Sequence, residues 1–148
     1  MDAAVSSPAK RAIDTIRPLA DSKGLDILTN ELFLDRNLGD SEGKSYWDME
    51  DVYVYLFNRQ TVIPGSESTD QVHQRAQKAR EFLYEMGNEG IAVCSHGPFI
   101  ASFCNVMFDK APDHYDPQHV PRNGEFHYFE VGDNGTLRRS ELRLTQVQ

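Results

Sequence analysis

Hydrophobic and polar residues along the chain repeat with two different periods, which predicts helices alternating with strands. The clearest helical period lies between Ser66 and Gly87, where the apolar residues recur every three or four positions: Val72, Ala76, Ala79, Leu83 and Met86. Serine is a favoured N-cap, and glycine is a favoured residue just past the end of a helix. The pattern therefore predicts a long helix, capped by Ser66 or Ser68 and stopped by Gly87.

A second helix is predicted near the N-terminus. Ser6-Ser7-Pro8 combines a serine cap with a proline at the first helical position, where the missing N–H costs nothing. We expect this helix to run to about Lys23 and to end at Gly24, with a kink or an early break at Pro18. The apolar residues of Leu25–Thr29 then predict a short strand.

Strand signals dominate the second half of the chain. Ile91–Cys94 is a continuous apolar run, which is typical of a strand covered on both faces, and Pro98–Phe108 is helical again. Glu125–Val131 and Thr136–Leu144 alternate around the turn signal Asp133-Asn134-Gly135, which predicts a hairpin. Helices alternating with strands indicate a layered α/β fold with a parallel or mixed sheet.

The segment from Glu31 to Pro64 has no clear period. It contains Gly39, Gly43 and a group of aromatic residues: Tyr46, Trp47, Tyr53, Tyr55 and Phe57. We interpret it as an ordered loop with short helical pieces, of the kind that covers a binding site and sets its specificity.

Composition narrows the functional classes. The 148 residues suit one domain, 39% of them are apolar, and the formal net charge of −8 argues against a nucleic-acid-binding face. Neither a membrane-spanning run nor a signal peptide is found. The two cysteines, Cys94 and Cys104, lie in apolar stretches, which favours a reducing, cytoplasmic compartment.

His96 is the first candidate for chemistry. It follows a predicted buried strand and precedes a helix opened by Pro98, and helix N-termini at that edge of an α/β sheet bind anions. Arg11, in the first turn of another helix, opposes the helix dipole, which a bound anion would explain. A packing or capping role for His96 and a solvated Arg11 remain the alternatives.

Two carboxylates are candidate acids, and two other arrangements are weaker. Asp35 and Glu67 could each protonate a leaving oxygen. Taken alone, Asp35 also fits a turn residue, and Glu67 also fits a residue at the start of a helix. Cys94 and His96 could form a thiol–imidazole pair, but a thiol in so apolar a run is usually inert. One polar cluster could bind a metal ion, although its spacing fits no usual ligand pattern. It consists of Asp113, His114, Asp116 and His119.

Four short motifs, taken in order, resemble those of the histidine phosphatase superfamily, in its phosphoglycerate-mutase-like branch. Ser6–Thr15 resembles the family's Ser-Pro-x-x-Arg-Ala-x-x-Thr segment, and Leu34–Lys44 resembles the stretch that carries its acid. Pro64–Ser68 is close to the Gly-Glu-Ser helix start, although Ser66 stands where glycine is usual. Val93–Gly97 resembles the second histidine motif.

The resemblance implies roles, a fold and a ligand. It implies phosphate binding by Ser7, Arg11, His96 and Gly97, and catalytic roles for His96, Asp35 and Glu67. Asp35 is one methylene shorter than the glutamate usual at its place. The implied fold is a three-layer sandwich with a mostly parallel sheet between helices, in a single domain over residues 1–148. The implied partner is a small phosphorylated molecule or inorganic phosphate, with no cofactor or metal.

One departure from the family changes the expectation. The family begins with a strand ending in Arg-His-Gly, whose histidine is phosphorylated during turnover, and this sequence contains no Arg-His-Gly. The resemblance therefore implies that the first strand and helix are absent. The missing strand would leave unpaired backbone groups beside Ile91–Ser95, which a homodimer or an exchanged strand could fill.

These observations leave three functional hypotheses. The first is a phosphate-binding domain that turns over poorly, because covalent catalysis lacks its nucleophile. The second is an active phosphomonoesterase or mutase whose nucleophile segment is supplied upstream or by another chain. The third is a non-catalytic interaction module that uses the aromatic loop around Trp47 as its contact surface.

Overall fold

The computed structural model describes residues 1–44, 63–114, 116–119, 125–133 and 135–144. Most of the predicted aromatic loop, including Trp47, lies outside these ranges. Its first part, which is described to residue 44, contains two short 3-10 helices, η1 (Glu31–Phe33) and η2 (Gly39–Ser41). The prediction of short helical pieces is therefore confirmed where it can be compared, and the contact surface around Trp47 stays a prediction.

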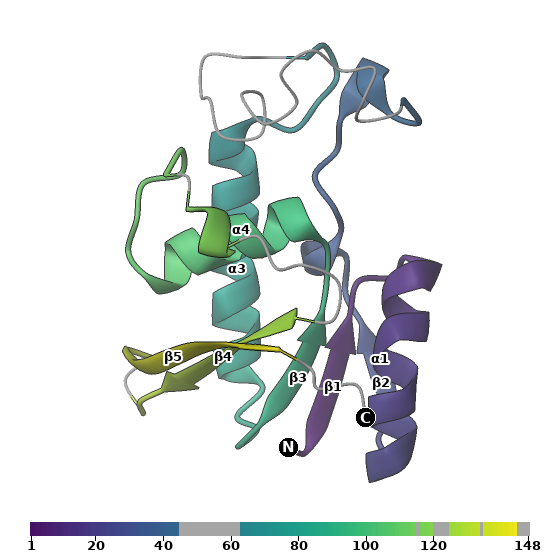
Figure 1. Cartoon of the computed structure of the whole chain (residues 1–148), viewed down its shortest axis with the longest axis vertical. Helices are drawn as coiled ribbons and strands as arrows, with labels where there is room; N and C mark the ends of the chain where they lie inside the picture. Colours follow the sequence, from purple (N-terminus) through teal and green to yellow (C-terminus); the bar gives the residue numbers. More distant parts are fainter. Residues whose placement is uncertain (45–62, 115, 120–124, 134, 145–148) are drawn as a thin grey trace.

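Three parallel strands form the main sheet (Figure 1). In spatial order they are β2 (Ile27–Thr29), β1 (Ala3–Ser6) and β3 (Ile91–Cys94). The register places Val5 of β1 beside Leu28 of β2 and Val93 of β3. Because all three strands run the same way, their carboxyl ends share one edge of the sheet.

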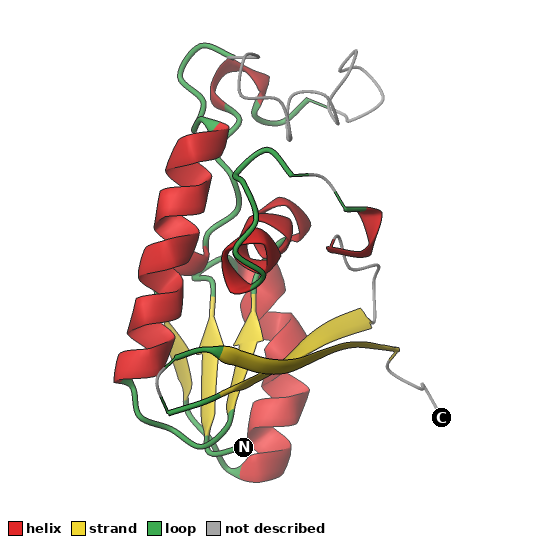
Figure 2. Cartoon of the chain, turned by 90° about the vertical axis from the view of Figure 1, so that its left-hand side faces the viewer, coloured by secondary structure: helices red, strands yellow, loops and turns green. Residues whose placement is uncertain are grey.

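Helices cover both faces of this sheet (Figure 2). On one face, α1 (Lys10–Lys23) packs Ile16 and Ala20 against Ala4 of β1. On the other face, α3 (Thr69–Glu85) and α4 (Gly97–Met107) build a larger core around Val5. That core contains Phe33, Val72, Ala76, Ala79, Phe99 and Val106. Alternate residues of β1 therefore pack into two different cores, one on each face of the sheet. The predicted layered α/β fold is confirmed.

The predicted hairpin is confirmed as β4 (Glu125–Val131) and β5 (Leu137–Leu144), which pair antiparallel as a separate sheet. Its turn is attached to α3: the Arg80 guanidinium donates to the Gly135 carbonyl at 2.8 Å, and the Tyr84 hydroxyl donates to the Asp133 carbonyl. These contacts fix the hairpin beside the main sheet without joining the two sheets.

The prediction that β3 is covered on both faces is wrong. Its Val93 side chain is 41% exposed, and among the described residues the sheet ends at β3. The carbonyls of Gly90 and Cys94 accept from the β1 side, so the backbone groups of Ile91 and Val93, which alternate with them, point to the open edge. An apolar run reports hydrophobicity but not position in the sheet.

The first helix differs from its prediction in two details. It begins at Lys10 because Ser6 ends β1, and the Ser7 hydroxyl accepts from the amide of Ala9 at 3.2 Å. It is not broken by Pro18, which lies on the exposed face, where water can satisfy the carbonyl that proline leaves without a donor. It ends as expected, with Gly24 in the left-handed region at φ 63°.

The long helix α3 begins and ends where its sequence signals lie. The Ser68 hydroxyl accepts from the Gln71 amide while the Gln71 side chain accepts from the Ser68 amide, which is a capping box. Gly87 has φ 67°, as expected of a residue just past a helix. Within the described residues, no helix is long and apolar enough to cross a bilayer.

Candidate functional site

The carboxyl ends of β1 and β3 bring Ser7 and His96 together. Ser6 pairs with Cys94 in the sheet, and the Ser7 amide donates to the Cys94 carbonyl at 2.9 Å. One step further, His96 Nε2 lies 2.9 Å from Ser7 Oγ, with both residues buried. Parallel pairing of two distant segments therefore creates the centre of the site.

Arg11 fixes the protonation of this histidine. Its Nε donates to His96 Nδ1 at 3.2 Å, so Nδ1 acts as an acceptor and the ring proton is assigned to Nε2, which donates to Ser7. Burial lowers the pKa of His96, with Arg11 adding to the effect and Asp35 opposing it. The imidazole is therefore neutral near pH 7.

Asp35 closes the cluster from the segment after η1. Its Oδ2 accepts from Arg11 Nη2 at 3.2 Å and lies 3.6 Å from His96 Nδ1. The Arg11 side chain is 69% exposed, so its pair with Asp35 is screened by water and can open for a ligand. The sequence-predicted Asp35 is thus beside the imidazole.

Gly97 is the first residue of α4, directly after the N-cap His96. The His96 side chain makes no capping hydrogen bond to that helix. The start of α4 therefore presents backbone N–H groups and a positive partial charge next to Arg11. Together these groups form a small corner in which a positive side chain lies next to a helix N-terminus.

Glu67 lies directly before the N-cap of α3 and pairs with Arg75, while its catalytic role stays a prediction. Its two carboxylate oxygens accept from Arg75 Nε at 2.8 Å and from Arg75 Nη2 at 2.7 Å. The two side chains are 18% and 17% exposed. A carboxylate bound through both oxygens to one guanidinium is well placed to hold that arginine in position.

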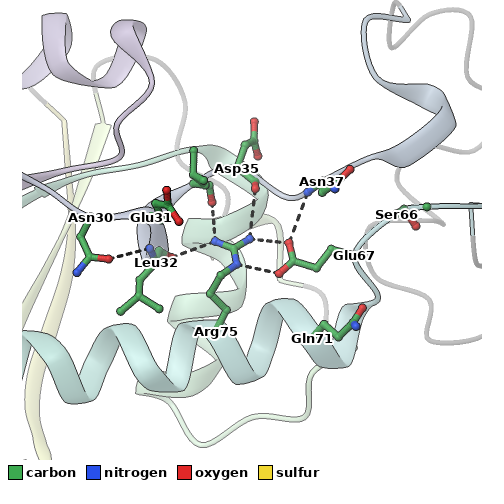
Figure 3. Close-up of a pocket in the computed structure, with 11 residues that line it drawn as sticks. Asn30, Glu31, Leu32, Asp35, Asn37, Ser66, Glu67, Gln71 and Arg75 are labelled. Carbon is green, nitrogen blue, oxygen red and sulfur yellow. Dashed lines mark hydrogen bonds and ion pairs between the residues drawn. The ribbon is translucent and has the colours of Figure 1, made fainter.

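Arg75 stands where the helix of the superfamily often carries an arginine, but the sequence assigned it no role. Its Nη1 donates to the carbonyls of Leu32 and Leu34 at 3.0 and 2.7 Å, and its Nη2 donates to the Asp35 carbonyl at 3.2 Å (Figure 3). It thereby fixes the backbone that carries Asp35. An available signal was a charged residue directly before Ala76, on the buried face of α3.

The start of α3 is held to the same segment by further backbone contacts. Buried Arg36 donates from Nε to the Glu67 carbonyl at 2.9 Å, and the Glu67 amide donates to the Asn37 carbonyl at 2.9 Å. Gly39 has φ 54°, and a Cβ there would lie 2.2 Å from the Pro64 carbonyl oxygen. Only glycine allows the two segments to approach so closely.

The cysteine alternative has no support in the geometry. Cys94 and Cys104 are free thiols, and burial raises the pKa of both, that of Cys104 to about 12. A thiol with a raised pKa is a poor nucleophile at neutral pH. Cys94 is therefore a packing residue of β3.

The metal alternative fares no better among the described residues, where no group of three or more His, Cys, Asp or Glu could hold an ion. Of the four residues proposed for it, Asp116 and His119 form a pair, 3.8 Å apart. His119 instead stacks on Phe108, with ring centroids 4.9 Å apart. The cluster is an aromatic packing unit at the end of α4.

Buried histidines make stability depend on pH. Burial is the main cause that lowers the pKa of His96, His119 and His127. Below about pH 6.5, the usual histidine pKa, the unfolded chain binds protons that the folded chain resists binding. We therefore expect the free energy of unfolding to be highest above that pH and to fall as the pH drops from 7.5 to 5.5.

Urea unfolding at a series of pH values measures this effect. Replacing His119 by phenylalanine, which keeps the stacking on Phe108, should flatten the pH dependence. Replacing the exposed His114 by glutamine is the comparison variant and should change the slope less, because burial, and not the neighbouring His114, is the main cause that lowers the pKa of His119. Equal stability at pH 7.5 and 5.5 in the wild type would contradict the expectation.

Comparison with known proteins now decides the family. The family model described as histidine phosphatase superfamily (branch 1) matches residues 1–141. The chain belongs to the histidine phosphatase superfamily. A curated protein of similar sequence is "Putative phosphoserine phosphatase 2" of Hydrogenobacter thermophilus. It is 24% identical to this chain over 143 residues, which are 93% of this chain and 70% of that protein.

Solved structures show that the fold itself is shared with known proteins. "Mycobacterial hydrolase 1" superposes with a TM-score of 0.77 at 18% identity, over 96% of this chain and 74% of that one. Bacillus stearothermophilus YhfR gives 0.72 at 22% identity, over 93% and 71%. A mycobacterial glucosyl-3-phosphoglycerate phosphatase, solved with inorganic phosphate, gives 0.63 at 20% identity, over 75% and 60%. The predicted parallel sheet flanked by helices is confirmed as the fold of this histidine phosphatase domain.

Proposed function

We propose that this histidine phosphatase domain binds the phosphoryl group of a phosphomonoester, or inorganic phosphate, at the corner formed by Ser7, Arg11, His96 and Gly97. The observation that carries the proposal is the buried His96 imidazole, held between the Ser7 hydroxyl at 2.9 Å and the Arg11 guanidinium at 3.2 Å. An anion placed there gains the Arg11 cation, the Ser7 hydroxyl as a donor and a helix N-terminus.

Asp35 is the general acid of this proposal. Its carboxyl oxygen lies beside both Arg11 and His96, at the side from which a leaving alcohol would depart. Glu67 keeps a role in the same machinery, as the anchor of Arg75, which holds the Asp35 backbone. This division assigns one carboxylate to chemistry and the other to position.

We further propose that turnover is impaired. All five histidines lie in described residues, and His96 is the one in the corner. His73 lies within α3, and the other three belong to the aromatic unit beside α4: His114, His119 and His127. A covalent phosphohistidine route needs a second imidazole as nucleophile. Without it, positioning and electrostatic help remain, and the rate falls by orders of magnitude.

The open edge of β3 favours a second candidate function. Among the described residues the sheet ends at β3, and the β4–β5 hairpin stands beside it as a separate sheet (Figure 1). A strand from an upstream segment or another chain could pair with Ile91 and Val93 and carry the nucleophile, giving an active phosphomonoesterase or mutase. Size-exclusion chromatography tests the related expectation of a homodimer or an exchanged strand.

Phosphate binding is the direct test of the first proposal. Titration calorimetry with inorganic phosphate should show binding that weakens about ten- to a hundredfold in His96→Ala and in Arg11→Ala, as expected for hydrogen bonds to a charged group. Arg17→Ala, an exposed position on the same helix as Arg11, is the matched control and should bind like the wild type. Equal binding in all four proteins would refute the site.

Turnover of a generic phosphomonoester separates the two candidates. The impaired domain should show little hydrolysis above background. Turnover comparable to that of an intact superfamily enzyme, lost in His96→Ala, would overturn the impairment and favour the second candidate. The same assay with purified monomer and with any larger species shows whether a second chain completes the site.

A further inference from the structure

A cavity of about 780 Å³ lies next to the anion-binding corner. It is lined by two segments that the preceding contacts hold together, the stretch after β2 and the start of α3 (Figure 3). Asp35 belongs to both places, since it lines the cavity and also contacts Arg11 and His96. A ligand whose phosphoryl group occupies the corner would therefore extend its alcohol part past Asp35 into this cavity.

The charges of the cavity wall disfavour a second anionic group. Arg75 is the one basic residue among the lining residues, and its five N–H donors all serve the protein: two bind Glu67 and three bind backbone carbonyls. Its charge is balanced by Glu67. The other titratable residues of the wall are Glu31 and Asp35, and because both are acidic neither would attract a second anion.

Three carboxamides supply the wall with donors. Asn30 Oδ1 accepts from the Leu32 amide at 2.9 Å, Asn37 Oδ1 accepts from the Gly39 amide at 2.7 Å, and Gln71 Oε1 accepts from the Ser68 amide at 2.8 Å. Each oxygen is thus used by the backbone. The NH₂ end of each side chain remains as the group with which it can bind a ligand.

Acceptors stand among these donors. Glu31 is exposed and contributes a carboxylate, and Asp35 contributes a second one. Hydroxyl groups both donate and accept, so they match a wall that contains both carboxamide NH₂ groups and carboxylate oxygens. Leu32 and Leu34 add apolar surface for the C–H groups of a carbon skeleton.

We propose that this cavity binds the alcohol part of a phosphomonoester that carries several hydroxyl groups and no second anionic group, such as a neutral sugar or polyol monophosphate. The inference rests on the proposed function, because the phosphoryl group must be held at His96. The cavity volume is within the range of about 300–1,000 Å³ typical of small-ligand sites.

Titration calorimetry with four probes tests the substrate class without requiring turnover. Glucose 6-phosphate should bind about tenfold more tightly than inorganic phosphate, because the cavity adds several hydrogen bonds. Fructose 1,6-bisphosphate and 3-phosphoglycerate should bind less tightly than glucose 6-phosphate, because each brings a further anion to Glu31 and Asp35. Tighter binding of either of these anions would overturn the inference.

A charge reversal supplies the matched variant. Glu31→Lys places a cation in the cavity wall and should improve the binding of 3-phosphoglycerate about fivefold, while the binding of inorganic phosphate stays near that of the wild type. Glu81→Lys makes the same change at an exposed position of α3 outside the cavity, and should leave the preference for glucose 6-phosphate unchanged. Equal effects of the two substitutions would also overturn the inference.

The outcomes separate this inference from the proposed function. If inorganic phosphate fails to bind, or binds equally well in His96→Ala, the proposed function fails. If phosphate binds through His96 but glucose 6-phosphate binds no more tightly than phosphate, the corner is correct and the assignment of the cavity is wrong. Preferential binding of phosphoserine, whose alcohol part carries an ammonium and a carboxylate, would replace the neutral polyol by a zwitterion.

Discussion

Replacing Phe33 by alanine is expected to lower the free energy of unfolding by about 3–5 kcal/mol. Phe33 is fully buried, and its ring makes edge contacts with Phe82 of α3 and Phe99 of α4, with centroids 6.1 and 6.0 Å apart. The substitution removes an aromatic side chain and leaves a cavity where three elements meet. Because neighbouring Leu32 and Leu34 bind Arg75, the damage should also reach Asp35.

Urea unfolding of the wild type and the Phe33→Ala variant measures this loss. Phe126→Ala is the matched control, since the same side chain on β4 is 43% exposed. It should cost less than about 1 kcal/mol, because little apolar surface is removed from the core. Similar losses in the two variants would show that Phe33 does not organise the core.

Local signals explain which parts of the fold were predictable. The Ser68 capping box, the left-handed Gly24 and the Asp133–Gly135 turn each depend on residues close in sequence, and the helix ends and hairpin follow from them. Helix α1 starts later than predicted, because Ser6 is the last residue of β1 and therefore does not act as the N-cap. Sequence alone cannot weigh a local cap against pairing with a distant strand.

Sheet position was not predictable for the same reason. The apolar run Ile91–Cys94 identifies a strand, but its partner in the sheet, β1, lies far away in the sequence. Among the described residues, no strand of the main sheet pairs with its other edge. Val93 is consequently exposed at an edge that its hydrophobicity suggested was covered. Edge or centre is a property of the assembled sheet and not of the strand.

The site was partly readable from the motifs. They named Ser7, Arg11, Asp35 and His96, and the fold brings these four together at the carboxyl edge. A motif does not say which way a side chain points. Glu67 therefore looked like an acid although it faces an arginine eight positions later.

Replacing Arg75 by glutamine is expected to lower the free energy of unfolding by about 3 kcal/mol. The substitution leaves the Glu67 carboxylate, 18% exposed, without its partner, and it removes the donors that hold the carbonyls of Leu32, Leu34 and Asp35. An ion pair so well shielded from water costs more to break than a surface pair. Lysine at position 75 should rescue only part of this loss, because one ammonium cannot reproduce five directed bonds.

A double-mutant cycle with Glu67→Gln shows whether the two residues act as a unit. The double variant should lose clearly less stability than the two single losses added together, with a coupling of about 1–3 kcal/mol. Arg80→Gln is the control, because Arg80 lies on the same helix and donates a hydrogen bond to the Gly135 carbonyl. It should cost about 1 kcal/mol without coupling to Glu67. If Glu67→Gln keeps full stability but loses any phosphoester turnover that the wild type shows, Glu67 acts as an acid. If the coupling between the two residues is strong, Glu67 is the anchor of Arg75, and Arg75 in turn positions Asp35.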